Sequence, residues 1–231
     1  MTSERGVADL WIFGYGSLMW RPDIPFVERH VASVTGFHRG FCVASTHHRG
    51  TEARPGLVLG LDRGGSCTGI AYRIPDATRQ ATIEYLRERE LIYGVYRTAR
   101  IRVQLHDEGH RQVSALAYIV ERAHPSYAGR LSAAEQVRRI RQAQGISGAN
   151  LDYLINTVNQ LTALGIRERG LERLVTLAAG PAKRGAVTET VRPAVRAIRA
   201  AWARHPVTAR PLTRDQRRRF CYRWRIGSEG H

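Results

Sequence analysis

Extended residue patterns dominate the first half of this chain, and helical patterns follow them. One helix is predicted among the strands at 76–91, and three more are predicted after them, at 132–145, 151–165 and 170–178. Strands that precede most of the helices favour an α+β fold over an alternating α/β fold. The predicted strands, rich in branched and aromatic residues, are 9–15, 31–35, 40–45, 56–61, 68–74, 101–105 and 113–120.

Capping and turn residues place the ends of several of these elements. Asp76 is expected to cap the first helix, and Ser132 with Glu135 forms the S-x-x-E capping box of the second, which Gly145 is expected to end. The turn at 107–109, Asp-Glu-Gly, would join the last two strands as a hairpin.

A change of character after Gly180 predicts a domain boundary near residue 178. The chain carries 36 basic and 20 acidic side chains, and residues 171–231 alone hold 14 and 4 of them. We therefore expect a catalytic domain at 1–178 and a basic, Pro- and Arg-rich extension at 179–231. Aromatic residues alternate with arginine at 214–227, which would suit single-stranded nucleic acid. The alternative is a solvated appendage, because nearly all the basic residues are arginine, which is also a compositional bias.

Three widely spaced cysteines, Cys42, Cys67 and Cys221, argue against a disulfide framework and favour a reducing compartment. No secretory signal is visible at the N-terminus, and no run of about 18 apolar residues predicts a membrane span. These features predict a cytoplasmic protein with no membrane partner. They leave the oligomeric state open.

The segment FGYGSLMW at 13–20 places two glycines directly after a predicted strand. A dinucleotide-binding fingerprint would need a third glycine at the position of Met19, so that class is disfavoured. The amides of Gly16, Ser17 and Leu18 instead form a tight loop suited to a carboxylate or an oxyanion. Gly16 would allow either a positive φ or close approach of a ligand. The alternative is an ordinary strand-ending turn.

The predicted helix at 76–91 carries a glutamate on its apolar side. Helical spacing puts Glu90 in one stripe with Ile83 and Leu86, whereas Glu84 and Glu88 point elsewhere. A carboxylate in an apolar stripe should have a raised pKa, as a general acid or base near neutral pH requires. The alternative is a helix-end glutamate that reaches solvent or pairs with Arg87 or Arg97.

Four other polar motifs carry weaker signals. His106 and His110 straddle a turn, so a zincin-like metal site is not expected. GGSCTG at 64–69 lacks the nucleophile-elbow spacing and indicates a hairpin turn. The run at 47–50 is polar and suits either an anionic ligand or a plain loop, and Tyr127 is expected in a loop, where it either packs or orients a substrate.

Four segments together resemble the ChaC-type γ-glutamylcyclotransferases, which act on glutathione. The resemblance spans about residues 10–178, and residues 179–231 match no part of that family. It implies an α+β fold in which a mixed sheet curls into a small barrel with helices outside. The segments are FGYGSLMWRPDIPF (13–26), GFHRGFCVASTHHRGTEARPGLVLGL (36–61), YLRERELIYGVY (85–96) and AHPSYAGRLS (123–132).

The resemblance also implies a reaction that needs no metal, cofactor or attacking water. The substrate's own α-amine would attack its γ-amide carbonyl and close the ring of 5-oxoproline, with Glu90 as the general acid and base. Two rivals stay open, namely other γ-glutamyl amides on the same fold and a nucleic-acid-binding module that uses the tail. The residues implied to bind substrate are Tyr15, Gly16, Ser17, Leu18, Tyr127, Arg39, His48 and Arg49.

Overall fold

A closed five-stranded β-barrel is the centre of the molecule in the computed structural model, which describes residues 9–91 and 94–180. The strands close in the order β1-β3-β2-β4-β5, and β5 returns to pair in parallel with β1 while the other neighbours are antiparallel. This confirms the predicted α+β barrel and the hairpin through 107–109. The strand bounds are β1 Leu10–Gly14, β2 Glu28–Ser45, β3 Gly56–Ile74, β4 Tyr96–Leu105 and β5 Gln112–Val120.

Two long strands replace four predicted short ones, which corrects the prediction of a turn at 64–69. Both β2 and β3 run unbroken through their glycines, and the register between them shifts where Gly36 faces Gly64 and Gly65. These three glycines have φ values of 90°, 97° and 72°, which other residues rarely adopt. Because the shift is a bulge, the hairpin bends there and continues pairing, so both strands can wrap around the barrel.

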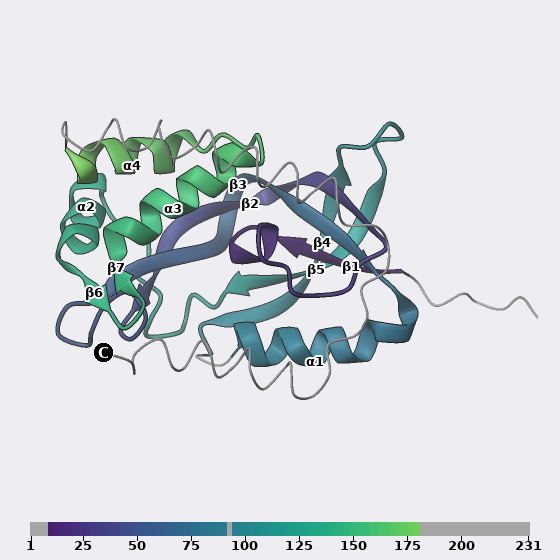
Figure 1. Cartoon of the computed structure of the whole chain (residues 1–231), viewed down its shortest axis with the longest axis horizontal. Coiled ribbons are helices and arrows are strands. Elements are labelled where there is room, and N and C mark those ends of the chain that lie inside the picture. The colour runs from purple at the N-terminus through teal and green to yellow at the C-terminus, as the bar shows by residue number, and fades with distance from the viewer. Residues whose placement is uncertain (1–8, 92–93, 181–231) are drawn as a thin grey trace, which may run out of the picture.

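Helix α1 lies on one side of the barrel, and three further helices lie on the opposite side (Figure 1). Helix α1 spans Arg79–Glu90 and follows a 3-10 turn, η2, at Asp76–Thr78. Thr78 therefore holds the N-cap position that the sequence assigned to Asp76. The other helices are α2 (Ala133–Gln142), α3 (Asn150–Ala163) and α4 (Arg169–Ala179).

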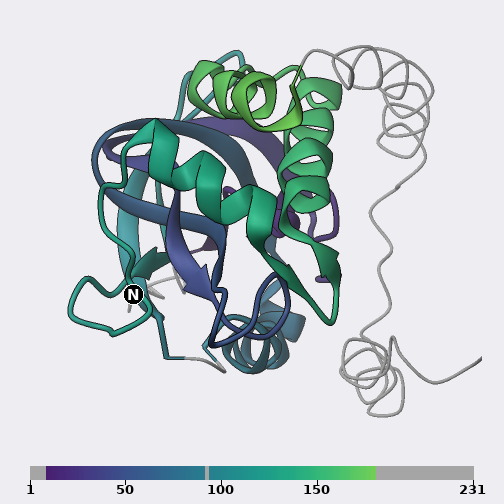
Figure 2. The same cartoon turned by 90° about the vertical axis from the view of Figure 1, so that its left-hand side faces the viewer.

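The start of α2 follows the sequence prediction, but its end does not. Ser132 accepts a hydrogen bond from the amide of Glu135 at 3.2 Å, as a capping residue should. The helix ends at Gln142, and Gly145 lies instead in a two-residue strand, β6 (Gln144–Gly145), which pairs with β7 (Gly148–Ala149). This small hairpin lies at the near end of α3 in Figure 2 and leads directly into that helix.

Two apolar clusters hold the layers together. One fills the barrel and includes Phe13 and Leu61, and the other lies between the barrel and the helices and includes Leu86 of α1 and Leu154 of α3. Each of these four side chains is fully enclosed, worth about 1.5–3 kcal/mol of burial apiece. The outer cluster thereby fixes where α1 and α3 sit against the barrel.

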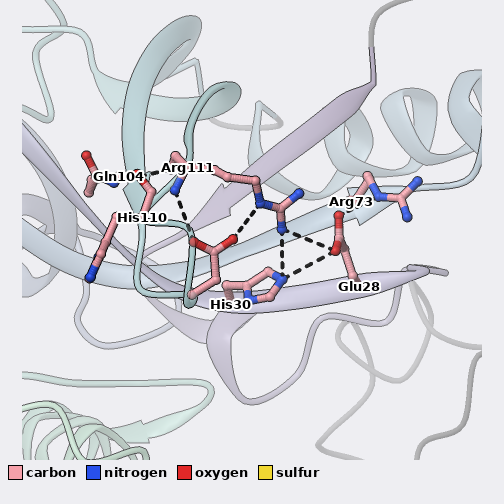
Figure 3. A network of polar contacts seen from close by, with 7 residues as sticks. Glu28, His30, Arg73, Gln104, His110 and Arg111 are labelled. Carbon is pink, nitrogen blue, oxygen red and sulfur yellow. Dashed lines mark hydrogen bonds and ion pairs between the residues drawn. The ribbon is translucent and has the colours of Figure 1, made fainter.

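An ionic network joins the β4–β5 turn to the start of β2 and the end of β3 (Figure 3). Arg111 contacts Asp107 at 2.5 Å, Glu28 at 3.4 Å and His30 at 3.5 Å, and Glu28 also accepts a hydrogen bond from Arg73 at 2.6 Å. Although burial opposes ionisation, the hydrogen bonds from Arg73 and His30 lower the pKa of Glu28. The network therefore closes this end of the barrel by charge pairing.

No helix within 9–91 or 94–180 combines the length and the apolar character that a membrane span requires. In the same part of the chain, no three metal-ligating side chains gather. His106 lies beside Ser33, with Nε2 3.1 Å from Oγ, and His110 lies in the turn at a φ of 44°.

Candidate active site

Arg39 holds the loop that follows β1 from inside the protein. Its side chain is completely buried, and Nε donates to the carbonyl of Tyr15 at 2.5 Å. Nη2 donates to the carbonyl of Thr68 at 2.6 Å and approaches Met19 Sδ at 3.4 Å, while Nη1 pairs with Glu168. All three guanidinium nitrogens thus contact the protein itself, which makes Arg39 a support of the loop.

The other carbonyls of the loop also accept hydrogen bonds, whereas three of its amides donate none in the described protein. Met19 N donates to Gly16 O at 2.9 Å, and Tyr72 Oη donates to Leu18 O at 2.9 Å. Among the backbone hydrogen bonds of the described residues, none is donated by the amides of Gly16, Ser17 or Leu18. These amides start the short 3-10 helix η1 (Ser17–Met19), where no intrahelical acceptor is available. The loop therefore presents donors and no acceptors.

Gly16 has a φ of −130°, so of the two predicted reasons for a glycine the positive φ is excluded and close approach of a ligand stays a prediction. A Cβ atom added there would meet only the Cδ1 of Leu59, at 3.7 Å, which is an ordinary contact. Gly16 therefore keeps an open space beside the loop, which a larger side chain would fill.

Glu90 is the last residue of α1, and the predicted stripe is confirmed. Leu86 is fully buried and Ile83 is half-buried on the same side, whereas Glu84 and Glu88 are exposed. The Glu90 side chain is 19% exposed, so most of it is enclosed.

Burial raises the pKa of Glu90, and the neighbouring Arg89 opposes the rise. Arg89 Nε lies 3.2 Å from Glu90 Oε1. The partner is thus neither Arg87 nor Arg97, the candidates from sequence, and Arg97 pairs instead with Glu121 at 3.4 Å. A carboxylate at a helix C-terminus also faces the negative end of the helix dipole, which favours the protonated form.

Tyrosines from separate elements surround this carboxylate. Burial raises the pKa of each hydroxyl, and the charge of Glu90 adds to the rise. The Tyr118 hydroxyl is buried without a hydrogen-bond partner, whereas Tyr96 Oη donates to Leu59 O at 2.6 Å. An aromatic wall excludes water and strengthens electrostatic effects inside. The five tyrosines are Tyr15, Tyr85, Tyr96, Tyr118 and Tyr153.

The sequence analysis did not identify Arg89 or four of these tyrosines, all but Tyr15, as site residues. The tyrosines at 96, 118 and 153 fit strand or helix patterns and gave no separate signal. Arg89 directly precedes Glu90, and that adjacency was the available signal. Its Nη2 donates to Ser17 Oγ at 2.9 Å, which joins the loop to the end of α1.

The run at 47–50 contacts Tyr153 through the side chain of Arg49. The Arg49 guanidinium carbon is 5.2 Å from the centre of the Tyr153 ring, and Nη1 donates to the carbonyl of Ser147. No carboxylate of the described residues forms an ion pair with Arg49. Burial lowers the pKa of His48 to about 4, helped by His47 and Arg49, so His48 is neutral at physiological pH. Of His48 and Arg49, the arginine therefore carries the positive charge beside Tyr153.

Tyr127 belongs to a different network. Its hydroxyl donates to Asp62 Oδ2 at 2.7 Å, and Arg122 Nε donates to Asp62 Oδ1 at 2.7 Å. A β-bridge to Val43 aligns the Tyr127 backbone with the end of β2. Within the part of the chain that the structure describes, no contact joins its side chain to Glu90 or the loop. The structure thus joins the loop to Arg39 and Glu90, and Arg49 is connected to them through Tyr153. Tyr127 packs against the same apolar cluster as Tyr96 but makes no direct contact with Glu90 or the loop in the described protein.

Comparisons with known proteins point to one family. The chain is 39% identical over 166 residues to the glutathione-specific γ-glutamylcyclotransferase of Escherichia coli (strain K12), covering 72% of this chain and 71% of that one. It is 35% identical to glutathione-specific γ-glutamylcyclotransferase 1 of Mus musculus, covering 72% and 76%. A crystal structure of a yeast γ-glutamylcyclotransferase specific to glutathione superposes with a TM-score of 0.66 at 24% identity, over 75% of this chain and 96% of that one, and supports the fold.

The family model described as ChaC-like protein matches residues 10–179, which include every group of the site. With that match, and with relatives above 30% identity over about 70% of their length, this chain belongs to the ChaC-like family.

Proposed function

We propose that this chain is a γ-glutamylcyclotransferase that converts glutathione to 5-oxoproline and cysteinylglycine. The observation that carries the proposal is an enclosed carboxylate, Glu90, joined through Arg89 to a loop whose amides have no acceptor in the described protein. The printed names of the relatives support glutathione as the substrate.

The reaction requires one proton-transfer group and one oxyanion site. The free α-amine of the γ-glutamyl residue attacks the γ-amide carbonyl, and a C–N bond closes the five-membered ring. Glu90 accepts the amine proton and then gives it to the amide nitrogen as the old C–N bond breaks. A raised pKa suits both halves of this task, because the carboxyl must gain and lose a proton near neutral pH.

The loop amides of Gly16, Ser17 and Leu18 supply the second requirement. When the amine attacks, negative charge develops on the carbonyl oxygen, and preorganised donors stabilise it without reorganisation. Arg39 belongs to this part of the site as a support, since its nitrogens hold the loop from behind.

Arg49 is the group best placed to attract the substrate's carboxylates. It forms no ion pair with an acidic residue of the described protein, although Asp152 acts on it electrostatically. Its guanidinium lies over the ring of Tyr153, a tyrosine whose hydroxyl also feels the charge of Glu90. His48 contributes as a neutral hydrogen-bonding group beside Ser147, with Nδ1 3.1 Å from Oγ. We place Tyr127 at the rim, where Asp62 holds its hydroxyl.

The domain and location predictions complete the proposal. Residues 1–178 would form the catalytic domain. The basic extension at 179–231 would contribute little to the active site. Nearly all of that extension lies outside the described residues, as do Cys221 and the aromatic–arginine run at 214–227. A cytoplasmic location, where glutathione is abundant and reduced, fits the cysteine usage. We propose no metal or cofactor, because the substrate supplies its own nucleophile.

Purified protein incubated with glutathione tests the proposal, with 5-oxoproline and cysteinylglycine measured by mass spectrometry. Other γ-glutamyl amides in parallel reactions test the substrate. Equal or better turnover of those amides would support the rival substrate class. If neither glutathione nor any other γ-glutamyl amide yields 5-oxoproline, the proposal is wrong.

A further inference from the structure

The side chain of Arg89 bridges the two halves of the proposed site. We propose that Arg89 is a positioning residue that holds the 15–23 loop in register with the carboxylate of Glu90. This inference rests on the proposed function, since it concerns the same reaction. Arg89 itself need not touch substrate.

One side of the guanidinium faces the loop. Nη2 donates to Ser17 Oγ at 2.9 Å, and Nη1 donates to the carbonyls of Arg21 at 3.0 Å and Pro22 at 3.4 Å. These contacts span both ends of the turn that carries the free amides. The Arg89 side chain is 20% exposed, so most of it is enclosed, although its contacts with Ser17 and Arg21 lie at the surface.

The other side faces the helix and the end of the loop. Nε lies 3.2 Å from Glu90 Oε1, and Nη1 lies 3.4 Å from Tyr85 Oη and 3.5 Å from Asp23 Oδ2. Asp23 has a φ of 49°, a left-handed conformation that is uncommon outside glycine, although aspartate adopts it more readily than most residues do. Arg89 is one of the groups that hold it there.

Arginine is suited to this bridge by its shape. A planar guanidinium offers five donors in fixed directions and can contact several acceptors at once, whereas a lysine ammonium is a single point of charge. The reaction demands this precision, because a displacement of about 1 Å between reacting groups can cost about a hundredfold in rate. The loop and α1 are more than fifty residues apart in sequence, so a side chain must set their spacing.

Arg89 also carries the positive charge nearest to Glu90. The other ionisable groups coupled to this carboxylate are five tyrosines, whose pKa values its charge helps to raise, from β4, β5, α3, α1 and the residue after β1. Loss of the Arg89 charge should therefore raise the pH at which Glu90 becomes a base. A residue with only a packing role would leave that pH unchanged.

The experiment compares Arg89→Gln with the matched control Arg87→Gln. Arg87 precedes Arg89 by two residues on α1, so it points to the other side of the helix. It is exposed and forms no ion pair in the described protein. Arg89→Gln is expected to lower kcat for glutathione about 10- to 100-fold and to shift the acidic limb of its pH profile to higher pH. Arg87→Gln should stay within about twofold and keep the profile. Arg89→Lys should keep the acidic limb and recover part of the rate.

A second measurement does not depend on activity. Hydrogen exchange followed by mass spectrometry on the peptide that covers 15–23 should show faster exchange in Arg89→Gln than in the parent, and no change in Arg87→Gln. If both variants exchange alike and share one pH profile, the positioning role is wrong. If the parent yields no 5-oxoproline, the proposed function fails, while the exchange result still decides whether Arg89 holds the loop.

Discussion

Replacing Glu90 with glutamine should change activity and stability in opposite directions. The amide keeps the shape of the carboxyl group and can still hydrogen-bond, but it cannot take the proton of the attacking amine. General acid–base catalysis contributes about 10²–10⁴-fold, so turnover of glutathione should fall by that factor, equivalent to about 3–5.5 kcal/mol in the barrier. Binding should survive, because the loop and Arg49 are untouched.

The stability change follows from the sign of the pKa shift. Burial raises the pKa of Glu90 in the folded protein, so ionisation costs more folded than unfolded. Folding is then penalised at every pH above the ordinary carboxyl range, and the penalty fades as the pH falls through the unfolded pKa. Glu90→Gln removes the penalty, and its unfolding temperature should exceed that of the parent at pH 8 and approach it near pH 4. The lost contact with Arg89 reduces the gain.

Two assays measure these effects on the same preparations. Release of 5-oxoproline under saturating glutathione gives the rate, and thermal unfolding at several pH values gives the stability difference. Glu84→Gln and Glu88→Gln are matched controls from the exposed faces of the same helix, and both should behave like the parent in rate and in unfolding.

Retention of most activity by Glu90→Gln would refute the assignment of the base, even if the family assignment stands. An inactive Glu88→Gln would do the same. A Glu90→Gln protein that is inactive and also less stable at pH 8 would contradict the reasoning from burial, because the enclosed charge would then be stabilising the fold.

Three further changes test other parts of the site. Gly16→Val should abolish turnover yet fold, since its Cβ meets only Leu59 at 3.7 Å; circular dichroism checks the fold, and a fully active variant would exclude the loop. Asp62→Asn should cost about 1–3 kcal/mol in denaturant unfolding at pH 7. Because hydrogen bonds from Arg122 and Tyr127 overcome burial and lower the Asp62 pKa, that difference should shrink as the pH falls, and a constant difference would contradict it. Deletion of 181–231 should leave the rate within a few-fold, and a hundredfold loss would place the extension in catalysis.

Local signals in the chain were sufficient for most of the secondary structure. The predicted helix at 151–165, the capping box of α2 and the turn at 107–109 each depend on residues within a few positions of one another. The errors arose where distant pairing decides. Glycines at 64 and 65 form a turn in isolation but a bulge when β2 lies alongside, because ladder hydrogen bonds outweigh the local preference.

For the site, the sequence by itself was sufficient to propose Glu90 as the base and the segment at 13–20 as the loop. The stripe of Glu90 with Leu86 and the ordered motif FGYGSLMW both survive in the structure, because helical spacing and strand-ending glycines act locally. The resemblance of four segments also pointed to the family that the comparisons then established.

Only the tertiary structure decided what each group can do. Arg39 and Arg49 look alike in the sequence, yet the first donates to Tyr15, Thr68 and Glu168, and the second forms no ion pair with an acidic residue of the described protein. The tyrosine wall and the Arg89 bridge exist because barrel closure brings strands and helices far apart in the chain to one place. The pairing of charges and the occupancy of hydrogen bonds belong to that packing, and no linear pattern encodes them.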